Sequence, residues 1–230
     1  MSYTHLFFDL DRTLWDYDAN ASGSLTTIYS EFGLDQKFQN PEEFITIYNH
    51  HNDLLWEQYR QGAVGKLELR EKRFRLTLME KGIDDSKLAL NMDALYMEIT
   101  PRSNILYPHT IETLEYLKEK QYHMFILTNG FLSTQQVKMA SSNLEHFFER
   151  IFSSEEAGRN KPHRDIFHWA VSSVNAKKKH CLMIGDDLEV DIRGAMNYGI
   201  DTIWFNPSGQ KVNVEPTHTI STLSELRVIL

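Results

Sequence analysis

The sequence predicts an α/β protein in which a parallel sheet carries helices on both faces and a helical domain is inserted after the first strand. After Pro101, short apolar runs alternate with segments of helical period, which is the pattern of βαβ units. The apolar run HLFFDL at residues 5–10 is typical of a strand, and the residues between it and Pro101 have a helical period alone. We therefore expect residues 1–15 and 101–230 to form a Rossmann-like core and residues 16–100 to form an inserted helical cap.

The insert is expected to contain four helices. Apolar residues recur at helical spacing through residues 25–32, and Gly33 is typical of a helix stop. Asn40 is a suitable cap for the second helix, because Pro41 takes the first helical position and Glu43 follows three residues after the cap. The other two helices are expected at residues 66–81 and from residue 85 or 86 to residue 99.

Helices and strands alternate through the second part of the core. Thr110 is expected to cap a helix that extends to residue 120, because apolar residues follow it at helical spacing. Further helices are expected at residues 133–141, from Pro162 onward, and at residues 188–198. Strands are expected at residues 123–128, 150–153, 181–185 and 201–205.

The composition limits the kind of partner that the protein binds. The sequence has 24 Lys and Arg and 32 Asp and Glu, which gives a formal net charge of −8. This balance argues against binding of a nucleic acid polymer, because neutralising a phosphate backbone needs a concentrated basic surface. A small phosphorylated metabolite is compatible with it, since a few local cations or a metal ion suffice.

The sequence favours a soluble cytoplasmic protein without membrane contact. Its apolar runs are shorter than the roughly 18–20 residues of a membrane span. The first residues, MSYTHLFFDLD, lack a basic region and end in aspartates, unlike a signal peptide. The single cysteine, Cys181, cannot form an intramolecular disulfide, which fits a reducing compartment.

Polar residues follow the predicted strands at their carboxyl ends. In an open parallel sheet these ends lie at one edge, where ligands bind. Each residue alone suits a turn, a cap or a solvated surface, but together they indicate a site. They are Asp9 and Asp11 after the first strand, Thr128 and Asn129 after the second, Lys161 at a helix entry, and Asp186, Asp187 and Asp191 after the strand at 181–185.

The acidic residues of this set predict a divalent cation. Asp9, Asp11, Asp186 and Asp191 would bring several like charges to one cleft. Two such charges at 4 Å repel by about 4 kcal/mol at an effective dielectric constant near 20. A cation removes this penalty, and Mg²⁺ prefers oxygen ligands, so we expect Mg²⁺.

Four segments of the chain resemble, in order, the four motifs of the haloacid dehalogenase-like hydrolases. They are DLDRTL, ILTNG, KP followed by HRDIF, and GDDLEVDIRGA, and the resemblance covers essentially the whole chain. The helical insert between the first two motifs is similar to that of the C1-capped subgroup. The Thr-Leu-Trp-Asp continuation, the GDDxxxD spacing and the ending WFNP are similar to bacterial nucleotidases that dephosphorylate pyrimidine and noncanonical nucleoside 5′-monophosphates.

The resemblance implies a role for each polar residue. Asp9 would be the nucleophile that forms an aspartyl-phosphate, and Asp11 would be the general acid for the leaving oxygen and then the base for water. Thr128 and the backbone amide of Asn129 would hold the phosphoryl oxygens. Lys161 would neutralise the charge spread over those oxygens.

The resemblance also implies a ligand set for Mg²⁺. The carboxylate of Asp9, the main-chain carbonyl of Asp11 and the carboxylate of Asp186 would bind the ion. Asp187 or Asp191 would support these ligands and the ion's waters. Asp191 is favoured, because Asp187 takes a place where small polar residues are frequent in the family.

Two residues beside the first motif have open roles. Arg12 stands where glycine is frequent in the family, so the backbone must form its turn without the conformational freedom of glycine. Trp15 begins the insert. Stacking on a substrate base and packing at the hinge are both compatible with its position.

The favoured function is a Mg²⁺-dependent phosphomonoester hydrolase, a 5′-nucleotidase acting on nucleoside monophosphates. A phosphatase or phosphomutase of sugar phosphates or other small metabolites would use the same residues and stays open. A 2-haloacid dehalogenase needs neither a metal nor an acid two residues after the nucleophile, so Asp11 and Asp186 count against it. A non-catalytic binding protein would not require both Asp9 and Asp11.

Overall fold

The strands of the sheet are all parallel, and the predicted α/β class is confirmed. The computed structural model describes residues 3–211 and 213–230, and within them the strand order is β3-β2-β1-β4-β5-β6. Four predicted strands have the predicted bounds, whereas the first ends earlier and β6 is additional. The strands are β1 (His5–Phe8), β2 (His123–Thr128), β3 (Arg150–Ser153), β4 (Cys181–Gly185), β5 (Asp201–Phe205) and β6 (His218–Ile220).

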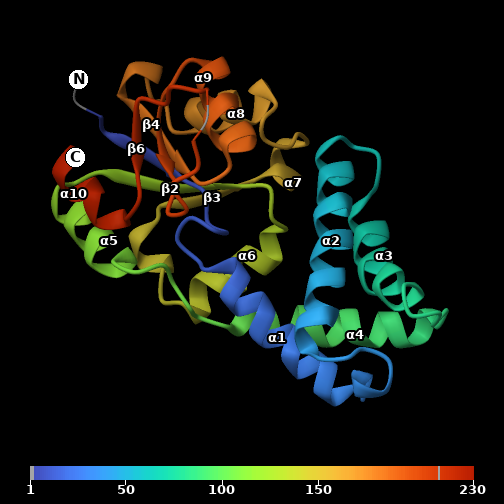
Figure 1. Cartoon of the computed structure of the whole chain (residues 1–230). Helices are drawn as coiled ribbons and strands as arrows, with labels where there is room; N and C mark the ends of the chain where they lie inside the picture. Colours follow the sequence, from blue (N-terminus) through green and yellow to red (C-terminus); the bar gives the residue numbers. More distant parts are fainter. Residues whose placement is uncertain (1–2, 212) are drawn as a thin grey trace. The chain divides into compact units, whose positions relative to one another are not determined.

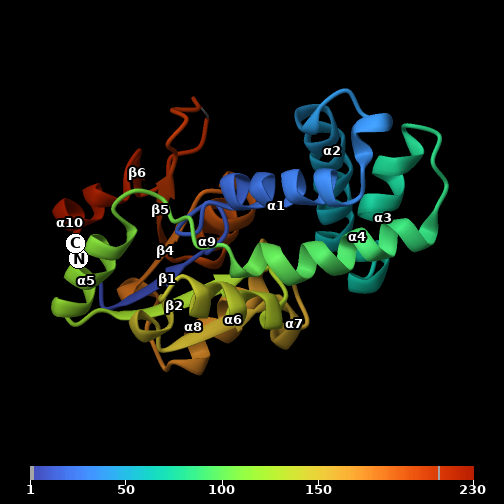
Figure 2. The ribbon, with the colours of Figure 1, turned by 90° about the horizontal axis from the view of Figure 1, so that it is seen from below.

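Strand β1 lies in the middle of the sheet, between β2 and β4 (Figure 2). From β1 the chain builds one half of the sheet through β2 and β3 and the other half through β4, β5 and β6. The strand order therefore reverses between β1 and β4, and a ligand is expected beyond their carboxyl ends. There, the main-chain N–H of Asp9 donates to the carbonyl of Ile184 at 2.9 Å.

Helices cover both faces of the sheet because successive side chains of each strand point to opposite faces. Leu6 and Phe8 of β1 pack in the cluster that contains apolar residues of α5 (Thr110–Glu119), α6 (Leu132–Ser141) and α10 (Leu226–Ile229). Phe7 packs in the opposite cluster, with residues of α8 (Arg164–Ser173) and α9 (Gly194–Tyr198).

The chain divides into two compact units, of which the second, Asp18–Ser103, is built from helices. The first consists of the chain up to Tyr17 and Asn104–Leu230. Asn40 Oδ1 accepts from the Glu43 N–H at 2.9 Å, which confirms the predicted cap. Among the described residues, no helix has the length and apolar character needed to cross a lipid bilayer. Figure 1 shows, from blue to green, α1 (Tyr17–Glu31), α2 (Pro41–Arg60), α3 (Lys66–Met79) and α4 (Ser86–Ile99).

Some helices of the core differ from the prediction. Thr110 is not a cap but the first residue of α5, because His109 takes the cap position with a φ of 68°. The hydroxyl of Thr110 instead donates to the Tyr107 carbonyl at 2.7 Å. A short helix, α7 (Ser154–Ala157), is additional. The helix predicted at residues 188–198 begins as a π-helical turn, Leu188–Arg193, and continues as α9.

A buried ion-pair network joins α3 to α4. Asp93 is 4% exposed and accepts from Arg73 Nε at 2.8 Å and from Arg70 Nε at 2.9 Å. The Arg73 guanidinium is also buried and lies 4.6 Å from the centre of the Tyr96 ring. Two arginines therefore depend on one carboxylate in the interior of the helical unit.

We predict that Asp93→Ala lowers the free energy of unfolding by about 3–5 kcal/mol, because it leaves a buried arginine without its counter-ion. Urea unfolding followed by circular dichroism measures this. The matched control is Asp84→Ala, which removes the exposed partner of Arg75 at 3.1 Å and should cost about 0–1 kcal/mol. Equal losses in the two variants would contradict the prediction.

Candidate active site

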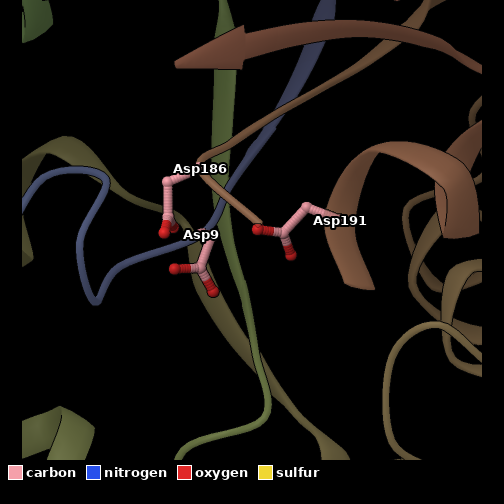
Figure 3. A group of neighbouring side chains, drawn as sticks. All are labelled: Asp9, Asp186 and Asp191. Carbon is pink, nitrogen blue, oxygen red and sulfur yellow. The ribbon is translucent and has the colours of Figure 1, made fainter. Parts of the chain in front are cut away.

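Three carboxylates converge where the strand order reverses. Asp9 follows β1, Asp186 follows β4 and Asp191 lies in the π-helical turn (Figure 3). One oxygen atom from each lies within 4.8 Å of the others. Asp9 and Asp191 are buried, so their charges are poorly screened by water.

The surroundings of these carboxylates disfavour their ionised form. Burial raises the pKa of Asp9 well above its usual range, and the Asp191 and Asp186 charges add to this effect. Burial, and then the charge of Asp191, raises the pKa of Asp186 to about 7. Burial raises the pKa of Asp191 as well. A cation placed among the three would reverse this penalty.

The ammonium of Lys161 lowers the pKa values of Asp9 and Asp191, but burial outweighs this effect. Lys161 Nζ donates to Asp9 Oδ1 at 2.6 Å, to Asp191 Oδ1 at 2.7 Å and to the Leu127 carbonyl at 2.7 Å. Burial alone would lower the pKa of Lys161, but the Asp191 and Asp9 carboxylates raise it, so the ammonium stays charged. Three carboxylates and one ammonium leave a formal charge of −2, which one divalent cation would balance.

Asn129 holds the main chain of Lys161. Its Oδ1 accepts from the Lys161 N–H at 2.7 Å, and its Nδ2 donates to the Lys161 carbonyl at 2.9 Å. The side chain of Asn129 therefore links the second motif to the third. The family resemblance implies a role only for the backbone amide of Asn129, so these side-chain contacts are an additional contribution.

Thr128 ends β2, the strand beside β1, and its side chain is buried. Its Oγ1 accepts from the Gly130 N–H at 2.9 Å and from Gln135 Nε2 at 2.8 Å. These two contacts fix the position of the hydroxyl at the same edge of the sheet as Asp9.

The carboxylate of Asp11 lies outside the three-carboxylate cluster. Its Oδ2 accepts from Gln135 Nε2 at 2.9 Å, and its Oδ1 forms an ion pair with Lys138. Gln135 and Lys138 are absent from the sequence-based hypothesis. Their i, i+3 spacing places both residues on one face of a helix, but the sequence does not show that this face is buried against Asp11.

Asp186 and Asp187 are neighbours in sequence but have different surroundings. Asp186 Oδ1 accepts from the Thr13 hydroxyl at 3.0 Å, within the cluster. Asp187 Oδ1 accepts from the Glu189 N–H at 3.0 Å and the Val190 N–H at 2.9 Å, so it caps the π-helical turn. The carboxylate of Asp187 is therefore engaged with backbone rather than with the cluster.

Trp15 is fully buried in the core of its unit. The ammonium of Lys138 lies 4.2 Å from the centre of its ring. One face of the ring is thus covered by a cation that binds Asp11, and the whole side chain is buried. These contacts favour the packing alternative for Trp15.

The chain is similar to known proteins over nearly its whole length. Pyrimidine 5′-nucleotidase YjjG of Escherichia coli is 32% identical over 100% of this chain and 99% of its own length. Pyrimidine 5′-nucleotidase PynA of Streptococcus pneumoniae is 30% identical over 98% of this chain and 94% of its own length. The solved structure of the HAD-hydrolase YfnB of Bacillus subtilis, bound to magnesium, superposes with a TM-score of 0.89 at 29% identity, covering 100% of this chain and 99% of that one.

The sequence profile of one family, the haloacid dehalogenase-like hydrolases, matches residues 6–205, which include all four motifs and the residues of the cluster. With the relatives above, this match confirms the predicted family and the predicted class of enzyme, a phosphatase. The chain belongs to the haloacid dehalogenase-like hydrolase family.

Proposed function

We propose that this protein is a Mg²⁺-dependent phosphomonoester hydrolase that acts through an aspartyl-phosphate, with nucleoside 5′-monophosphates as its substrates. The observation that carries the proposal is the cluster of Asp9, Asp186 and Asp191, in which Asp9 and Asp191 are buried and both bind the ammonium of Lys161. The likeness to YjjG and PynA, both pyrimidine 5′-nucleotidases, supports the choice of substrate.

The residues present fit Mg²⁺. The cluster offers oxygen atoms alone, and its excess of negative charge suits a divalent ion. Asp9 and Asp186 would bind the ion through their carboxylates and Asp11 through its main-chain carbonyl, with Asp191 supporting them. When bound, Mg²⁺ neutralises these carboxylates and draws charge from the phosphoryl oxygens.

In the first step Asp9 attacks phosphorus. Lys161 holds the Asp9 carboxylate in place through Oδ1, and one oxygen of that carboxylate forms the new P–O bond. The bond from phosphorus to the leaving oxygen breaks, and a protonated Asp11 gives its proton to that oxygen. The alcohol leaves, and Asp9 carries the phosphoryl group.

In the second step water releases the phosphoryl group. Asp11, now a carboxylate, takes a proton from the water whose oxygen attacks phosphorus. The bond between phosphorus and Asp9 breaks, which restores the carboxylate and yields inorganic phosphate. In both steps the Thr128 hydroxyl and the Asn129 amide hold the phosphoryl oxygens, and Lys161 balances their charge.

We expect phosphate release from nucleoside monophosphates with Mg²⁺ and none with EDTA. The purified protein is assayed for free phosphate against pyrimidine and purine nucleoside 5′-monophosphates and against sugar phosphates of matched concentration. If phosphate were released faster from sugar phosphates than from nucleoside monophosphates, sugar phosphates would be the substrates instead. A product that keeps its phosphate, with the group moved to another hydroxyl, would indicate a mutase.

We predict that Asp9→Asn abolishes the phosphoenzyme, because an amide is a poor nucleophile. Asp11→Asn should slow phosphoenzyme formation roughly 10² to 10⁴-fold on a nucleotide, and less on p-nitrophenyl phosphate, whose leaving group needs no proton. Single-turnover measurements on both esters separate the two roles. Residual phosphoenzyme in Asp9→Asn, or equal losses on both esters in Asp11→Asn, would falsify this division.

We predict that Asp186→Asn removes stabilisation by Mg²⁺, because the ion loses a carboxylate ligand. In the wild type, free Mg²⁺ at 100 times its Kd should stabilise the fold by about 2.7 kcal/mol. Thermal unfolding with Mg²⁺ and with EDTA measures the difference. The matched control is Asp187→Asn, since that residue caps a turn and an amide oxygen can still accept there. The same Mg²⁺ shift in both variants would refute the assignment.

The Asp186→Asn variant also tests how the charge of Asp186 affects stability when no metal is present. The folded-state pKa of Asp186, about 7, lies above the ordinary value of 3.8, so its ionisation costs stability. That cost is absent below pH 3.8 and grows as the pH rises to about 7. In EDTA we therefore expect Asp186→Asn to gain stability relative to wild type between pH 4 and pH 7, as followed by urea unfolding. A constant difference across this range would contradict the prediction.

A further inference from the structure

Gln135 joins two groups of the site that belong to different motifs. It is fully buried on α6, and its Nε2 donates both to Asp11 Oδ2 at 2.9 Å and to Thr128 Oγ1 at 2.8 Å. Lys138, three residues further along α6 and also buried, forms an ion pair with the other oxygen of Asp11. One face of α6 thus binds both oxygens of the Asp11 carboxylate.

The contacts of Thr128 determine where its hydroxyl hydrogen goes. A hydroxyl has two acceptor positions and one hydrogen. Oγ1 already accepts from the Gly130 N–H and from Gln135 Nε2. Both acceptor positions are therefore filled, and the hydrogen is left for donation to an acceptor such as a phosphoryl oxygen.

The surroundings of Gln135 select one orientation of its amide. A Cβ atom at Gly130 would lie 2.2 Å from Gln135 Nε2, so the space that the amide occupies exists because residue 130 has no side chain. Among the described residues, Oε1 of Gln135 is buried without a hydrogen-bond partner. The reverse orientation would direct this oxygen at the Asp11 carboxylate, which in its ionised form is also an acceptor. The contact between Nε2 and the ionised Asp11 carboxylate therefore sets the orientation.

We propose that Gln135 and Lys138 are positioning residues for phosphoryl transfer. Lys138 anchors the carboxylate of Asp11, and Gln135 ties that carboxylate to the hydroxyl of Thr128. These contacts would keep Asp11, the acid that protonates the leaving oxygen, at a fixed distance from a phosphoryl group that Thr128 holds. This inference rests on the proposed function and assigns a task to two residues outside the four motifs.

The test uses Lys138→Met and Gln135→Leu, with Lys138→Arg as the conservative variant. The control is Val137→Ser, which changes an exposed side chain on the same helix. Phosphoenzyme formation is measured in single turnovers on uridine 5′-monophosphate and on p-nitrophenyl phosphate, and inhibition by inorganic phosphate reports binding. The full chain with Mg²⁺ is used throughout.

We expect Lys138→Met to lose about 10²-fold on the nucleotide, the loss typical of a misplaced catalytic group, and much less on p-nitrophenyl phosphate. Its inhibition by phosphate should stay unchanged. Gln135→Leu should show the same dependence on the leaving group and also weaker inhibition by phosphate, because Thr128 loses a contact. Lys138→Arg should recover most of the rate, and Val137→Ser should match the wild type.

The inference would be overturned if the Lys138 and Gln135 variants lost the same factor in rate on both esters, or lost no rate at all. Both residues would then have a purely structural role. If Lys138→Met does not fold, Gln135→Leu decides alone, because it keeps the contact between Lys138 and Trp15. The wild type and Asp11→Asn are measured beside them. A wild type that is inactive on both esters would overturn the proposed function and the inference together. If the wild type and Asp11→Asn behave as expected but the Lys138 and Gln135 variants keep the wild-type rates, the inference alone is overturned.

Discussion

The arrangement of the site depends on the buried ammonium of Lys161. Its three hydrogen bonds join the end of β1, through Asp9, to the end of β2, through the Leu127 carbonyl, and to the turn after β4, through Asp191. Without this ammonium two carboxylates would be buried with no cation between them, a strongly unfavourable state. Asn129 extends the connection by binding the main chain of Lys161 on both sides. One side chain thus fixes the relative positions of all four motifs.

The topology of the sheet explains why residues so far apart in sequence reach this ammonium. The strands β1 and β4 pair in register, with Phe8 beside Ile184, so the residues that follow them emerge together at one edge. Strand β2 lies on one side of β1 and β4 on the other, so the strand order reverses between β1 and β4, and ligands bind beyond strand ends at such a reversal. Buried acidic residues at these strand ends lose hydration, and a cation compensates for the loss better than any neutral partner.

Local pattern predicts most of the fold and the three carboxylates that the structure brings together, Asp9, Asp186 and Asp191. Apolar runs bounded by polar residues gave the strands, and the rule for strand ends gave the position of Asp9 and Asp186. The same reasoning could not identify Gln135 and Lys138, because polar residues within a helical pattern are typical of a solvated face, and only the tertiary contacts with Asp11 show that this face is buried. Strand β6 has three residues, too few for a periodic pattern, and it is recognised by its pairing with β5.

The turn after β4 contains two aspartates, Asp187 and Asp191, that have different roles although they are the same residue type. The Ile192 N–H donates to the Asp187 carbonyl at 3.2 Å, an i to i+5 bond that makes this turn wider than an α-helical one. Asp191 is thereby brought back over the strand end, where its Oδ2 accepts from the Asp187 N–H at 3.2 Å. A Cβ atom at Gly185 would lie 2.4 Å from that same oxygen, so the close approach requires glycine. The carboxylate of Asp187 accepts hydrogen bonds from backbone N–H groups, whereas that of Asp191 lies beside other carboxylates and an ammonium. Because their partners differ, Asp187 stabilises the turn and Asp191 belongs to the charged cluster.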